Sequence, residues 1–191
     1  MFLVSKKDQE IKIRNMGRLD AYFVTVQVGD IQFMLRELGS RYAVHFSVDD
    51  NVHTAEVLAI AGKSVVTQEF EREESGKFVE RIKQIIPKET IVQLMLKEFA
   101  SLEAPISHPL YDKHPLIAPF VEMLFVESEN EYQSIGPEKR DFESYLEKEY
   151  NVELIPSEEM EMILAKIVTA MRFLHLTEKD MAKEFFKNIQ V

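Results

Sequence analysis

Two histidines with a carboxylate between them are the residues whose types and spacing come closest to a chemical site. His108, Asp112 and His114 fall in one short stretch, and Glu103 lies just upstream. Imidazole and carboxylate groups are the ligands that zinc, manganese or iron take from a protein. A small metal-dependent hydrolase built on this stretch is therefore one hypothesis, although the spacing matches no established ligand pattern and prolines stiffen the chain around both histidines.

The other signatures of catalysis are missing from the sequence. The chain has no cysteine, which removes disulfides, cysteine-bound metals and thiol nucleophiles. It contains no Gly-x-Ser-x-Gly elbow, no phosphate-binding glycine loop and no dinucleotide fingerprint. A second cluster, His45, Asp49, Asp50 and His53, brackets an expected hairpin turn, where aspartates are common because they bond their own backbone. We therefore expect no cofactor and favour a protein that is not an enzyme.

Negative charge is concentrated in one stretch, residues 127–161. Twelve acidic residues there face only Lys139, Arg140 and Lys148, whereas the chain as a whole carries a net charge of −10. Such a block repels nucleic acid and anionic membranes and attracts basic surfaces. The leading hypothesis is a protein-binding factor, such as an inhibitor, immunity-type, chaperone-like or phage accessory protein. Its expected binding residues are Glu127, Glu129, Glu131, Tyr132, Glu143, Tyr145 and Glu147.

The acidic stretch also has three simpler interpretations. Charged faces often serve solvation alone, and acidic residues near Ser157 fit the first turn of a helix. The basic residues Arg172, Lys179, Lys183 and Lys187 are also placed to pair with the block internally.

Besides the metal-dependent hydrolase and the protein-binding factor, a third class of function is a further alternative. This is a structural subunit that assembles into a homo-oligomer.

The sequence predicts a cytoplasmic protein. The first residues contain too short an apolar run for a signal peptide, and no later segment has the unbroken apolar length of a membrane span. Because of the acidic stretch, the predicted partner is a protein with a basic surface, and neither nucleic acid nor a membrane.

The elements that position these residues are predicted to form an α+β fold, with an N-terminal antiparallel meander of about five to six strands and a C-terminal helical part packed on it. The alternation of side chains that is typical of a strand is clearest over residues 21–28. The next clearest strands are residues 41–48 and 64–70. Residues 31–38 and 52–61 fit strand or helix, and we favour strands because Gly29-Asp30 and Gly62-Lys63 suit tight hairpins.

From residue 78 the apolar spacing becomes helical, which predicts a helix pair interrupted at Pro87. The predicted organisation is residues 1–103 as sheet plus helix pair, 104–119 as a proline-rich crossover and 120–191 as a mainly helical part, in one domain or two closely packed subdomains. Residues 120–126 fit a buried strand or a short helix, and residues 127–136 a solvated loop. Pro137, Ser157 and Thr177 mark the starts of three helices, the second being the central one.

Overall fold

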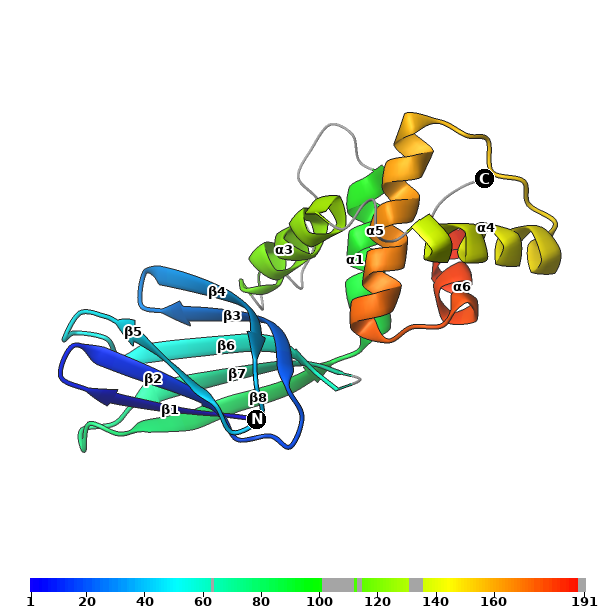
Figure 1. Cartoon of the computed structure of the whole chain (residues 1–191). Helices are drawn as coiled ribbons and strands as arrows, with labels where there is room; N and C mark the ends of the chain where they lie inside the picture. The colour runs from blue at the N-terminus through cyan, green and yellow to red at the C-terminus, as the bar shows by residue number, and fades with distance from the viewer. Residues whose placement is uncertain (63, 101–111, 113–114, 131–135, 189–191) are drawn as a thin grey trace. The chain divides into compact units, whose positions relative to one another are not determined.

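The computed structural model describes residues 1–62, 64–100, 112, 115–130 and 136–188 (Figure 1). Eight strands and then five helices are seen within these residues, which confirms the α+β class. Their bounds are β1 (Phe2–Lys7), β2 (Glu10–Asn15), β3 (Ala21–Val28), β4 (Ile31–Leu38), β5 (Ala43–Ser47), β6 (Thr54–Ala61), β7 (Ser64–Arg72), β8 (Phe78–Ile86), α1 (Lys88–Ala100), α3 (Ile117–Asn130), α4 (Gly136–Tyr150), α5 (Glu158–Leu174) and α6 (Glu178–Asn188).

The chain divides into two compact units. The first comprises residues 1–87 and 109–120, and the second comprises residues 88–108 and 121–191. The first unit therefore holds the strands, and the second holds α1, α4, α5, α6 and most of α3. Helix α1 groups with the other helices of the second unit.

The described strands of the first unit form two antiparallel sheets. One has the order β1-β2-β5, and the other has the order β4-β3-β6-β7-β8. The strands from β2 to β7 account for the predicted five to six, but they are divided between the two sheets, and β1 and β8 add to them. One hydrophobic cluster draws on both sheets, with Ile11 and Ile13 from the first and Val24, Val26 and Val57 from the second, all of them fully buried. Burial of these aliphatic side chains between the sheets is what stabilises the unit.

The two segments that fitted either strand or helix are strands. Residues 31–38 form β4, which pairs with β3 through a two-residue turn, because Val28 lies opposite Ile31. Gly29 in that turn has φ +57°, a conformation that only glycine adopts readily. Residues 54–61 form β6, whose last residue, Ala61, lies opposite Ser64. Gly62 follows it at φ +61°, so glycine turns favour the hairpins here as predicted.

The prediction of a helix from residue 78 was wrong. These residues form β8, an edge strand that pairs with β7 from Phe78 to Ile86. Phe78 and Ile86 are buried at its two ends, but Ile82 and Ile85, which completed the apparent helical stripe, are 41% and 66% exposed. Pairing with β7 decides the conformation, and the β-branched residues of this segment suit a strand. The second helix of the predicted pair is present as α1.

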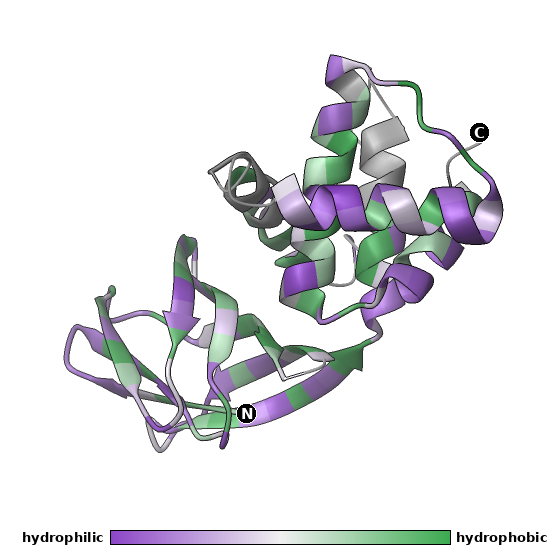
Figure 2. Ribbon diagram, turned by 45° about the vertical axis from the view of Figure 1, so that its right-hand side comes forward, coloured by the Kyte–Doolittle hydropathy of each residue, from purple (hydrophilic) through white to green (hydrophobic). Residues whose placement is uncertain are grey.

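Helix α5 shares the central position predicted for it with α6, because each of the two contacts the other and both α1 and α4. The start of α5 is confirmed at Ser157, whose hydroxyl accepts a hydrogen bond from the Met160 amide at 3.0 Å. Helix α6 begins after Thr177, which exchanges hydrogen bonds with Asp180. Figure 2 shows hydrophobic and hydrophilic residues interleaved along the helices, as expected where one face of each is buried.

Candidate functional site

The candidate site is built on α4, and both ends of this helix are fixed by local sequence. Pro137 lies in its first turn, where the missing amide hydrogen has no helical partner to lose. At the other end Asn151 adopts a left-handed conformation with φ +53°, and its amide donates to the Glu147 carbonyl at 3.0 Å. Phe142 and Leu146 are fully buried against the unit. Residues 143 and 147 therefore lie away from the core.

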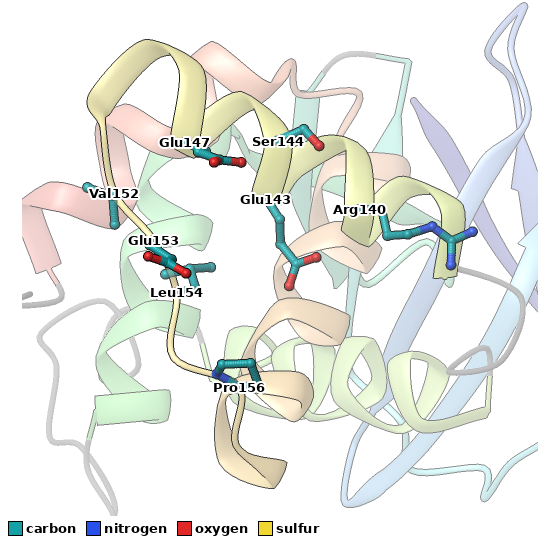
Figure 3. A pocket seen from close by; sticks show the side chains of 8 residues that line it. All are labelled: Arg140, Glu143, Ser144, Glu147, Val152, Glu153, Leu154 and Pro156. Carbon is teal, nitrogen blue, oxygen red and sulfur yellow. The ribbon is translucent and has the colours of Figure 1, made fainter.

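A groove lies between α4 and the segment that follows it, and its volume is about 370 Å³. Figure 3 shows Glu143 reaching from the helix toward this space, with residues 152–156 along its other side. The lining combines three carboxylates with aliphatic and proline side chains. The lining residues are Arg140, Glu143, Ser144, Glu147, Val152, Glu153, Leu154 and Pro156.

The charge of the groove is negative, because Glu143, Glu147 and Glu153 outnumber Arg140. Among the residues that the structure describes, none of these three carboxylates forms an ion pair. A cationic side chain that enters the groove would therefore meet carboxylates that need not first release a partner.

Other members of the acidic stretch are paired within the chain. Glu138 accepts a hydrogen bond from Arg172 at 2.6 Å, and Glu161 forms an ion pair with Lys139. The bond from Arg172 holds the pKa of Glu138 below its usual value. Of the internal pairing that the sequence allowed, the ion pair of Arg172 is thus present, on the side of α4 that faces α5. It does not extend to the groove.

The predicted binding residues are only partly brought together. Glu143 and Glu147 lie in the groove, one helical turn apart. Tyr145 lies on another side of α4, where its ring packs near Tyr150 with centroids 6.1 Å apart. Tyr150 in turn packs on Phe186 of α6 at 4.6 Å. Desolvation, followed by the proximity of Tyr150, raises the pKa of Tyr145. We conclude that Tyr145 supports the packing of α4 rather than the groove.

The prediction of a loop over residues 127–136 was wrong for residues 127–130. Glu127 and Glu129 lie in α3, which continues to Asn130. No glycine or proline stands between Pro119 and Gly136 to end the helix earlier, so the backbone bonding continues past the apolar run. Glu131 and Tyr132 lie outside the described residues, and their predicted role stays a prediction.

The hypothesis of a metal site at His108, Asp112 and His114 stays untested, because both histidines lie outside the described residues. Over the part of the chain that is described, no group of three histidine or acidic side chains is placed to hold a metal ion. Of the second cluster, His45 pairs with Glu10, and Asp50 lies 3.4 Å from Lys6. His53 lines a separate shallow pocket with residues of the β7–β8 connection.

The sequence reasoning missed the residues that form the second wall of the groove: Val152, Glu153, Leu154 and Pro156. A signal was present, because Pro156 and the cap at Ser157 together predict a short extended connection between two helices. That signal places the segment beside α4, but the depth of the space between them depends on side-chain packing.

Comparisons with protein-family models, with curated proteins and with solved structures found no match to this chain. Across the described residues, each helix is too short or too polar to cross a membrane. The groove and its charge are therefore the features from which a function can be inferred.

Proposed function

We propose that this chain is a protein-binding factor, and that the groove between α4 and residues 152–156 receives basic side chains of its partner. The observation that carries the proposal is the difference between two sets of carboxylates on one acidic stretch. Glu138 and Glu161 are paired with Arg172 and Lys139, whereas those of the groove have no ion pair within the described residues.

The groove supports binding by its shape as well as by its charge. Recognition surfaces commonly combine an apolar centre with polar groups that fix orientation. Here Val152 and Leu154 are partly buried, and the carboxylates of Glu143, Glu147 and Glu153 line the same groove. A lysine or arginine side chain has an aliphatic stem and a charged end, so it can cover these apolar side chains while its cation reaches a carboxylate.

The expected strength follows from the exposure of the site. One solvent-exposed ion pair contributes about 0.2–1 kcal/mol, so three such pairs change affinity by about 0.6–3 kcal/mol. This corresponds to a change in Kd of roughly 3-fold to 150-fold. Binding is also expected to weaken with salt, because the Debye length falls from about 10 Å at 0.1 M to about 3 Å at 1 M.

The test uses the full chain and a fluorescent nonapeptide library in which four positions are lysine or arginine, with a second library carrying glutamate at those positions. The wild type is expected to prefer the basic library by about threefold or more. The triple variant E143Q/E147Q/E153Q should lose that preference. A matched variant, E37Q/E122Q/E149Q, removes the same charge from exposed positions that do not line the groove and should behave as the wild type.

Equal binding of the basic library by the wild type and the groove variant would refute the proposal. A preference lost equally in both variants would refute it as well, because net charge rather than the groove would then explain binding.

A further inference from the structure

The backbone beside the groove has unused hydrogen-bonding capacity. The last backbone hydrogen bond at the end of α4 is donated by the Val152 amide. The next one along the chain is at the start of α5, where the Ser157 carbonyl accepts from the Glu161 amide. Over the described residues, the amides of Glu153, Leu154 and Ile155 have no acceptor. Residues 153–155, which lie in no helix or strand, therefore offer amide donors to which another chain can add its own backbone.

The local sequence favours an extended conformation at these residues. Ile155 precedes a proline, and steric conflict with the proline ring keeps such a residue out of the helical region. Figure 3 shows the segment running past α4 from Val152 to Pro156 without a helical turn. The side chain of Ile155 is 81% exposed, so an apolar surface lies next to the unpaired amides. An incoming strand could cover it with an aliphatic side chain.

The spacing of the carboxylates fits an extended peptide. Glu143 and Glu147 are four residues apart on one helix, a rise of about 6.0 Å. Alternate residues of a strand are about 6.6 Å apart and point to the same side. Two basic side chains separated by one residue can therefore reach both carboxylates.

We propose that the groove binds an extended segment of a partner protein with the pattern basic–apolar–basic, and that this segment adds as a strand to residues 153–155. The proposal rests on the proposed function, since it names the conformation and pattern of the ligand at the same site. Carboxylates supply charge recognition, and the backbone of residues 153–155 supplies the geometric constraint that selects an extended chain over a helix.

The test measures binding of the full chain to an acetylated and amidated pentapeptide, Val-Lys-Val-Lys-Val. Two derivatives carry a single N-methyl group, one on the central valine and one on the following lysine. Successive amides of a strand point to opposite edges, so only one derivative should lose a bond to the protein. We expect at least fivefold weaker binding for that derivative and less than a twofold change for the other. An alanine-rich helical peptide with lysines four residues apart is expected to bind more weakly than the pentapeptide.

Two results would overturn strand addition while the proposed function stands: both methylated peptides binding as the parent does, or tighter binding of the helical peptide. In either case sensitivity to E143Q/E147Q/E153Q would still support the acidic groove. Failure of the wild type to bind any of these basic peptides would overturn both proposals.

Discussion

Replacing Glu56 by glutamine is expected to stabilise the sheet unit at neutral pH by about 0.5–1 kcal/mol. Glu56 on β6 lies directly opposite Glu69 on β7, and both side chains are partly buried. Like charges at directly opposite positions destabilise a sheet. For carboxylates about 6 Å apart, an effective dielectric constant of about 40 gives a repulsion of about 1.4 kcal/mol, which screening at 0.15 M reduces to about 0.7 kcal/mol.

The pH dependence follows from the direction of the pKa shift. Desolvation, and secondly the charge of Glu69, raises the pKa of Glu56 above its ordinary value of 4.5. Below pH 4.5 the carboxyl is protonated in both folded and unfolded chains and contributes nothing. As pH rises, the unfolded chain loses this proton first, so the folded state loses stability until the pH passes the raised pKa. The gain from E56Q should therefore be absent at pH 4 and full at pH 8.

The assay is urea unfolding followed by circular dichroism near 218 nm, at pH 4 and pH 8 and at low and high salt. The control is E37Q on β4, an exposed position, which should change the free energy of unfolding by less than about 0.3 kcal/mol. A lower stability of E56Q at pH 8, or the same effect of E56Q at both pH values, would refute repulsion between Glu56 and Glu69 as the cause.

Two further predictions concern single hydrogen-bonded groups. T177A should lower the stability of the helical unit by about 1 kcal/mol, measured by urea unfolding at 222 nm, because it removes the hydroxyl that accepts from the Asp180 amide. Bonds from Thr177 lower the pKa of Asp180 below 3.8, so the loss of stability in T177A should shrink as pH falls through that lowered pKa. A loss of stability that does not change at acid pH would contradict this role of Thr177. Q68L should cost about 1–3 kcal/mol in the unfolding transition near 218 nm, because buried Gln68 accepts the Phe2 amide at 2.6 Å; a cost below about 0.5 kcal/mol would show that water replaces this bond.

Local sequence was sufficient wherever a single residue fixes the backbone. Gly29 and Gly62 mark hairpin turns because the left-handed conformation is open to glycine, and both turns were predicted. Ser157 and Thr177 mark helix starts because their side chains bond the first free amides. In each case the cause lies within a few residues, so the sequence contains it.

Local sequence failed where a distant partner decides. Phe78 and Ile82 have helical spacing, but bonding to β7 makes the segment a strand. The bulge at Glu69 and Phe70 also shifts the register of that pairing, which a simple alternation cannot anticipate.

The candidate site was predictable in its charge and not in its shape. Glu143 and Glu147 were expected to bind a partner because of the excess of acidic residues. The sequence could not show that Glu138 is paired with Arg172, since these residues lie on different helices. It also could not show that residues 152–156 stand across from α4. Side-chain packing between helices separates the paired carboxylates from those of the groove.

The most direct test of the acidic groove is a reversal of its charge. The variant E143K/E147K should lose affinity for the lysine and arginine library and gain affinity for the glutamate library. E37K/E149K, which makes the same change in net charge outside the groove, should keep the wild-type preference. A groove variant that still prefers basic peptides, or a control variant that reverses its preference to the same extent, would contradict binding through the groove.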